Sequence, residues 1–208
     1  IYSDVGITFN SPVMLAQDTT LVTGNNKGIR FNSTLDGARI LSLETTGEVF
    51  FLDNVGGINT VAGIQTINQN PFTFTFNTAG KTLQVGQLNV TTTGTIDLTV
   101  DQVYTGSGLT LTTLGKVLSP GDIHLGNVTS NFGSSGSVNI SNAGNLYLEG
   151  NIDLDGSFNQ SALVNTVTIT NFGTGYTSSP TVTFTGGGAS LANQATASAT
   201  LAINRFLG

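Results

Sequence analysis

Residues 28–57, GIRFNSTLDGARILSLETTGEVFFLDNVGG, set the pattern that the rest of the chain follows. Two segments of it begin with a glycine and continue in alternating apolar residues, ending at Phe31 and Phe51. The same start precedes Phe9, so the three phenylalanines recur roughly every twenty residues. A repeat of about twenty residues, made of short strands in which apolar and polar residues alternate, is typical of a stacked β-solenoid.

The rest of the chain supports this interpretation through pairs of apolar residues spaced by two, as half-buried strands require. Asn, Asp or Gly follows each pair and suits a tight corner. No window free of glycine carries helical spacing, and β-branched residues dominate, so a helical fold is excluded. About 160 residues in coils of about twenty give roughly eight coils and a rod on the order of 40 Å long. The predicted inward residues of the first third are Ile7, Phe9, Val13, Leu15, Leu21, Ile29, Phe31, Leu35, Leu41, Leu43, Val49, Phe51 and Val55.

Two further segments extend the prediction. Phe72-Thr73-Phe74-Thr75-Phe76 predicts a strand with three phenylalanines facing the core and two threonines facing outward. After Phe158 the composition shifts to strand-length segments separated by Gly, Tyr and Pro turns, which predicts a separate unit. We therefore expect an all-β protein: a right-handed parallel β-solenoid over 1–160, followed by a small antiparallel β unit over 161–208.

Composition narrows the possible functions. Charged residues make up 9% of the chain and the net charge is -6. With only six Lys plus Arg and no basic cluster, we expect no nucleic-acid partner. The absence of cysteine excludes disulfides, and no apolar run is long enough for a membrane span, so we expect no membrane insertion. The chain starts without an initiator Met, as a processed form or a piece of a longer protein does.

The solenoid repeats resemble the β-helical passenger regions of filamentous-haemagglutinin-like exoproteins and autotransporter adhesins. The segments that carry this resemblance are 6–13, 28–38 and 49–57. The segment NFGTGYTSSPTVTFTGGG, residues 171–188, resembles the GxGYxxxPxV hairpin units of tail-fibre-like extracellular proteins. Both resemblances imply a secreted protein at a cell or virion surface, and neither supplies a catalytic residue.

Few residues are candidates for chemistry. Carboxylate pairs could bind a cation or cleave a polysaccharide, and of these we take Asp153 and Asp155, on one strand face, as a Ca²⁺ candidate; no other cofactor is expected. A second pair is Asp97 and Asp101. His124 is the only histidine and faces outward, so it cannot seed a zinc site. We expect no enzymatic activity.

Threonine pairs recur along the chain and leave ice binding open as an alternative. Thr73/Thr75, Thr91/Thr93 and Thr110/Thr112 are about nineteen residues apart, close to one coil. A flat ladder of such pairs would present regularly spaced hydroxyls. The other interpretation is that threonine is simply a favoured outward residue of strands.

The two ends of the chain suggest how the rod is used. A solenoid exposes unpaired strand edges at its ends, and soluble ones normally carry caps. No cap precedes the first repeat, and the chain ends in an apolar segment, so we expect head-to-tail strand addition into a filament or, equally, truncation from a longer adhesin rod. The main prediction is a secreted structural fibre subunit with a possible adhesive role toward surface glycans; a carbohydrate-binding, tail-spike-like β-helix is the alternative. The predicted assembly residues are Ile1, Tyr2, Val5, Leu201, Ile203, Phe206 and Leu207.

Overall fold

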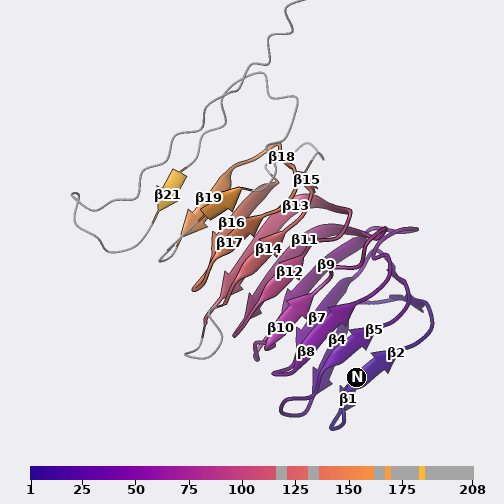
Figure 1. Ribbon diagram of the computed structural model, residues 1–208. Coiled ribbons are helices and arrows are strands. Elements are labelled where there is room, and N and C mark those ends of the chain that lie inside the picture. Colours follow the sequence, from indigo (N-terminus) through magenta and orange to yellow (C-terminus); the bar gives the residue numbers. More distant parts are fainter. Residues whose placement is uncertain (116–120, 131–135, 162–166, 170–182, 186–208) are drawn as a thin grey trace, which may run out of the picture.

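A computed structural model describes residues 1–115, 121–130, 136–161, 167–169 and 183–185 of the 208-residue chain. Every regular element among them is a β-strand, and all strand pairs are parallel. Successive coils stack along one axis, as Figure 1 shows. The described residues contain no helix that could cross a membrane.

The most regular face of the stack is an eight-stranded parallel sheet with one short strand from each coil. Between neighbouring strands the register advances by 20 to 27 residues, from Ile7 through Ile29, Val49 and onward to Val167. Eight rungs at ~4.8 Å make a stack about 34 Å long. The predicted solenoid is confirmed, with coils of about twenty residues or somewhat more. In stacking order the strands are β2 (Ile7–Phe9), β5 (Ile29–Phe31), β8 (Glu48–Phe51), β10 (Thr73–Thr75), β12 (Ile96–Leu98), β14 (Ile123–Leu125), β17 (Leu146–Leu148) and β20 (Val167–Ile169).

An eleven-stranded sheet forms the remaining long face, and a two-stranded sheet starts a third. The third face joins the large sheet through bridges from Leu35 to Val55 and from Val55 to Leu83. The two faces connect because two long strands, β11 (Thr82–Thr92) and β13 (Gln102–Thr113), turn the corner between them, with a register shift between Val85 and Gln87. The large sheet runs through β1 (Tyr2–Ser3), β4 (Thr19–Thr23), β7 (Ile40–Glu44), β9 (Val61–Thr66), β11 (Thr82–Thr92), β13 (Gln102–Thr113), β16 (Ser137–Ser141), β19 (Phe158–Ser161) and β21 (Thr183–Thr185), with β15 (Val128–Ser130) and β18 (Ile152–Leu154) branching from β13. The two-stranded sheet pairs β3 (Val13–Met14) with β6 (Leu35–Asp36).

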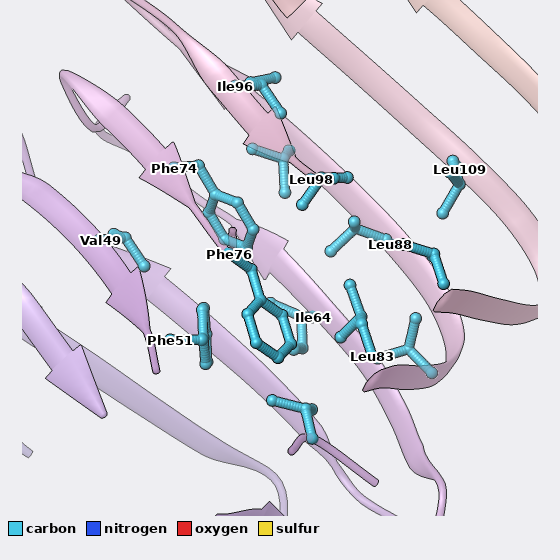
Figure 2. Packing of buried hydrophobic residues seen from close by; sticks show 14 of the residues in the cluster. Val49, Phe51, Ile64, Phe74, Phe76, Leu83, Leu88, Ile96, Leu98 and Leu109 are labelled. Atoms are coloured by element: carbon cyan, nitrogen blue, oxygen red, sulfur yellow. The ribbon is translucent and has the colours of Figure 1, made fainter. Parts of the chain in front are cut away.

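The core consists of columns of like side chains, one per coil, because parallel in-register pairing places equivalent residues above one another. The ring centroids of Phe9 and Phe31 lie 4.9 Å apart, and those of Phe31 and Phe51 lie 4.9 Å apart with planes 2° from parallel. The column continues into Phe74 and Phe76, which are tilted against Phe51 (Figure 2). The inward residues predicted for the first third are all buried or half-buried.

One phenylalanine of the predicted aromatic strand is not in the core. Phe74 and Phe76 are buried, whereas Phe72 is 42% exposed. Strand β10 begins only at Thr73, and the Phe72 backbone N–H donates to the Gly47 carbonyl at the corner before it. Alternation places side chains only inside a strand, so the prediction that three phenylalanines face inward was wrong for the residue at the corner.

Buried hydroxyls close one corner of the coil. The hydroxyl oxygens of Thr23 and Thr45 lie 2.8 Å apart, and each lies 2.6 Å from the Lys27 carbonyl oxygen. The two hydroxyls can therefore donate to this carbonyl or to each other. In later coils Thr92 and Thr113 bond to the Gly94 and Gly121 carbonyls at 2.8 and 2.5 Å. Backbone groups that leave the ladder at the corner therefore find partners inside the protein.

A buried carboxylate holds another turn. Asp36 is 3% exposed, and its side-chain oxygen accepts the backbone N–H groups of Ile58 and Asn59 at 2.7 and 3.3 Å. The two donors belong to the next coil, so this carboxylate links neighbouring coils. We assign the Asp36 side chain a structural role, because a buried polar group needs hydrogen-bond partners and the two backbone N–H groups supply them.

The C-terminal region requires a correction. We predicted an antiparallel unit over 161–208, but β20 pairs in parallel with β17, and β21 pairs in parallel with β19. Val167 lies opposite Leu146, about one coil further along the chain, so these two strands extend the long sheets. Period-two alternation identifies a strand without identifying its partner, which is why the pairing was predicted wrongly. The rest of the predicted unit, including the turn residues 171–182, lies outside the described residues.

Candidate functional site

The edge of the first coil is the first candidate site. Strands β1, β2 and β3 stand first in the three sheets, and among the described residues each pairs with a strand on one side only. All three belong to residues 1–14 and lie at one end of the stack (Figure 1). An unpaired row of backbone N–H and C=O groups is a template for another strand.

Hydrogen bonds show which backbone groups face this edge. Ile7 donates to the Gly28 carbonyl at 3.1 Å, and Phe9 accepts from the Asn32 N–H at 2.8 Å. In a parallel ladder alternate residues bond to opposite sides, so the N–H and C=O of Thr8 point toward the open edge. Val13 and Leu15 bond to the second coil in the same way, which turns the backbone groups of Met14 outward.

The core also reaches the surface at this end. Ile7 and Leu15 are 9% and 7% exposed, whereas Ile29 and Leu35, one coil further in, are fully covered. Phe9 is half-buried because its ring has a stacked neighbour on one side, Phe31. Among the described residues, this end of the stack therefore leaves part of the apolar core and the outward ladder groups uncovered.

The predicted assembly residues at this end are exposed. Ile1, Tyr2 and Val5 are 69%, 66% and 86% exposed. The Ile1 amino group donates to the Thr20 carbonyl at 2.8 Å, so β1 is held against the second coil. The Tyr2 hydroxyl donates to the Asp4 carboxylate, and this hydrogen bond, together with the nearby negative charge, raises the pKa of Tyr2 above its ordinary value. The other predicted assembly residues, Leu201, Ile203, Phe206 and Leu207, lie outside the described residues.

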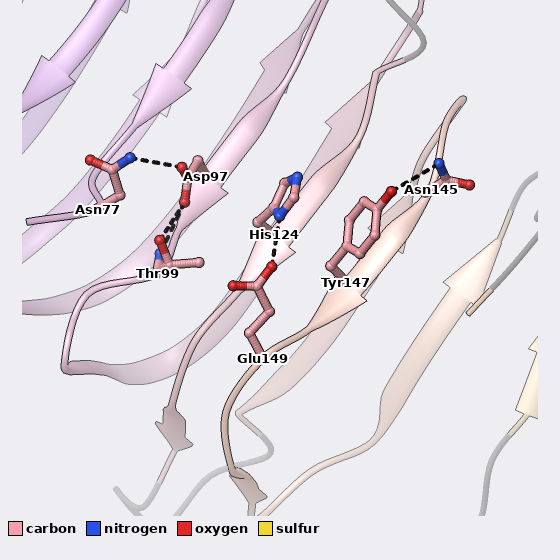
Figure 3. A network of polar contacts seen from close by, with 7 residues as sticks. All are labelled: Asn77, Asp97, Thr99, His124, Asn145, Tyr147 and Glu149. Atoms are coloured by element: carbon pink, nitrogen blue, oxygen red, sulfur yellow. Dashed lines mark hydrogen bonds and ion pairs between the residues drawn. The ribbon is translucent and has the colours of Figure 1, made fainter. Parts of the chain in front are cut away.

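A polar row on the outside of the eight-stranded sheet is a second candidate (Figure 3). Asp97, His124 and Tyr147 occupy equivalent outward positions on β12, β14 and β17. The His124 and Tyr147 rings stack with centroids 4.4 Å apart and planes 14° from parallel. His124 Nδ1 lies 2.8 Å from a Glu149 carboxylate oxygen.

The oxygens of Asp97 already have partners. One accepts from the Asn77 side chain at 2.9 Å, and the other accepts from the Thr99 hydroxyl and N–H at 2.7 and 3.2 Å. These bonds form a local turn and account for Asp97 structurally. Sequence analysis placed His124 outward correctly but missed its partner ring. The triplets Ile96-Asp97-Leu98, Ile123-His124-Leu125 and Leu146-Tyr147-Leu148 share one pattern and would have aligned the row.

Asp153 and Asp155 are both exposed, and half-buried Leu154 lies between them, as alternation predicted. The Asp155 N–H donates to the Ser130 carbonyl at 3.1 Å, and Asp153 lies opposite Thr129. In the part of the chain that the structure describes, no three or more His, Cys, Asp or Glu residues gather as a metal-binding group. Among the described residues, the Ca²⁺ candidate therefore consists of two carboxylates with no third acidic residue beside them.

The three threonine pairs do not form one ladder. Thr91 and Thr112 are direct neighbours on β11 and β13, whereas Thr73 and Thr75 belong to the other long sheet. The column beside Thr110 contains Asn89 and Asn139. A flat hydroxyl array, which the ice-binding alternative needs, is not built from these residues.

No protein-family model matches this chain, and no curated protein or solved structure matches it either. The fold is therefore assigned from the chain's own strand pairing: it is an all-β parallel solenoid.

Proposed function

We propose that this protein is a non-enzymatic structural subunit of an extracellular filament or surface fibre, and that copies join head to tail by strand addition. The observation that supports this most is the edge of the first coil. Free ladder groups at Thr8 and Met14 lie next to incompletely covered core residues there. Both features are satisfied by one more coil of the same cross-section.

The polarity of the stack favours a second copy as the occupant. All pairs in the described sheets are parallel, so the edge at β2 and the opposite edge at β20 have the same strand direction. The last rung of one copy could then continue the first rung of the next without reversal. Such a contact is heterologous and does not close on itself, which produces filaments.

Charge and composition are consistent with this proposal. The chain has a net charge of -6 over 208 residues, so repulsion between stacked copies is modest. The resemblance of the repeats to surface exoproteins supports a secreted protein at a cell or virion surface. In this setting a stiff rod would act mechanically.

The proposal is tested with the full chain by sedimentation velocity over a concentration series and by negative-stain electron microscopy. We expect polymers with an axial repeat of roughly 40 to 60 Å, the solenoid plus its C-terminal residues. Val5→Lys places a charge at the edge, at a side chain that is already 86% exposed. It should raise the concentration needed for assembly by at least about tenfold, equivalent to about 1.4 kcal/mol.

Leu114→Lys is the matched control. Leu114 is a similarly exposed apolar residue, at 54%, and it follows β13 in the middle of the stack. This variant should assemble like the original protein. A wild-type chain that stays monomeric at high concentration, or equal inhibition by the two lysines, would rule out assembly through this edge.

A further inference from the structure

A hollow lies at the corner where β11 and β13 turn from the third face into the large sheet. Its volume is about 190 Å³, and its lining residues come from three successive coils. They are Thr60, Gln84, Val85, Gly86, Tyr104 and Gly106.

Two glycines belong to the lining, and they differ in why they are glycines. A Cβ on Gly86 would come within 2.4 Å of the Ala62 carbonyl oxygen, so backbone packing alone requires glycine there. A Cβ on Gly106 would lie 3.4 Å from the nearest atom, the Gly86 oxygen, which is ordinary van der Waals contact. Gly106 has no positive φ either. The fold would therefore accept alanine at Gly106, a residue that lines the hollow.

The side chains around the hollow are an aromatic ring and two uncharged polar groups. Tyr104 is 38% exposed and lies opposite Gln84 in the sheet register. The Gln84 side-chain amide donates to the Thr60 hydroxyl oxygen at 2.7 Å, which fixes the orientation of the amide. Gln84 and Thr60 thus partner each other, and the surface that the hollow exposes is mainly apolar.

Charge and size select the ligand class. None of the six lining residues is charged, so the hollow offers nothing to hold a phosphate, a carboxylate or an ammonium group. Its volume is below the roughly 300–1,000 Å³ typical of sites for drug-sized molecules. A single saturated ring with hydroxyl groups fits both limits: its C–H face would pack on the tyrosine and the apolar lining, and its hydroxyls would stay in water at the open mouth.

We propose that this hollow is a subsite for one ring of a neutral glycan. One weak site on each subunit would become a multivalent surface in a filament, because linked sites raise the effective concentration of their ligand. The site itself does not depend on assembly, since all its residues belong to one copy.

The test is an NMR titration of ¹⁵N-labelled full-length protein with five neutral disaccharides: cellobiose, maltose, lactose, N,N′-diacetylchitobiose and mannobiose. We expect at least one to bind with a Kd of about 1 mM or somewhat weaker, corresponding to about 4 kcal/mol. Its shifts should centre on Gly86, Gly106, the Tyr104 amide and the Gln84 side-chain amide. Sialyllactose, a charged glycan, should bind no better at this hollow.

Two variants locate the site, and a third is the control. Gly106→Ala adds a methyl group to the wall of the hollow and should weaken binding by about fivefold or more, while the melting temperature stays close to that of the original protein. Tyr104→Ala should abolish the shifts. Phe72→Ala, which removes an aromatic ring that is 42% exposed at the corner before β10, should leave them unchanged.

Three outcomes would overturn the proposal. One is that no disaccharide shifts these residues. Another is that the shifts persist with unchanged affinity in both Gly106→Ala and Tyr104→Ala. The third is that a proline-rich peptide binds the hollow and the sugars do not, which would assign it to a protein partner. None of these results bears on Val5→Lys, so failure here is distinct from failure of the proposed assembly.

Discussion

The phenylalanine column provides a quantitative test of how the coils support one another. Phe31 is 1% exposed and has stacked rings on both sides, Phe9 and Phe51, each at 4.9 Å. Replacing a buried phenylalanine with alanine costs about 3–5 kcal/mol of stability. Each lost aromatic pair accounts for about 0.5–1.5 kcal/mol, part of which is already included in that cost. Phe9 is half-buried and stacks on one side only. We expect Phe31→Ala to lower the free energy of unfolding by about 4–6 kcal/mol and Phe9→Ala by about half as much.

The measurement is guanidinium denaturation followed by circular dichroism, on protein that sedimentation shows to be monomeric. Repeat proteins can lose terminal coils before the whole stack unfolds, so the Phe9 variant should also broaden the start of the transition. Equal costs at the two positions in the monomer would refute the reasoning, because they would mean that the first coil is as fully packed as the second. If copies join as proposed, the two costs should converge in the assembled protein, since a second copy would cover the open face of Phe9.

Three other changes test the contacts between coils. Asp36→Ala should destabilise the fold by about 1–3 kcal/mol in urea denaturation, because the Ile58 N–H loses its acceptor, whereas Asp36→Asn should cost less. Gly47→Ala should cost about 1–3 kcal/mol or prevent folding, since its Cβ would lie 2.4 Å from the backbone of the preceding coil; a thermal melt that matches the original would contradict this. The hydrogen bond from Lys81 lowers the pKa of Asp53, so the pair contributes fully at neutral pH and loses its contribution as the pH falls below the unfolded value of 3.8 and through the folded one. Because both side chains are about 30% exposed, Lys81→Met should remove no more than about 1 kcal/mol at pH 7, and this difference should vanish in acid denaturation near pH 2.

The sequence predicted those parts of the fold that depend on local alternation. Leu41 and Leu43, or Ile96 and Leu98, face the core because side chains two apart on a strand share one side. Alternation failed at Phe72, where the strand had not yet begun. It also identified Val167–Ile169 as a strand while the partner was predicted wrongly, because pairing is decided by the coil beneath it.

The buried polar groups show a different limit. Asp36 and Gly37 were predicted as a corner because Asp and Gly tolerate tight turns. The structure confirms a positive φ of 115° at Gly37, but the two N–H groups that Asp36 accepts come from the next coil. A contact between coils becomes visible only once the length of each coil is known.

Unequal coil length is also the reason why the corner hollow could not be found in the sequence. Its walls come from Thr60, Gln84 and Tyr104, which are separated by 24 and 20 residues. A search at a fixed period of twenty would align Gln84 with Tyr104 and would pair neither with Thr60. The extra residues lie in the coil that contains β10, where the step from Val49 to Phe74 is 25 residues. Stacking of core side chains keeps the strands of that longer coil in register, and its additional residues lie outside the strands. Surface residues such as Thr60 are therefore placed by the core columns, so a binding surface on this fold can change its residues while the solenoid beneath it stays the same.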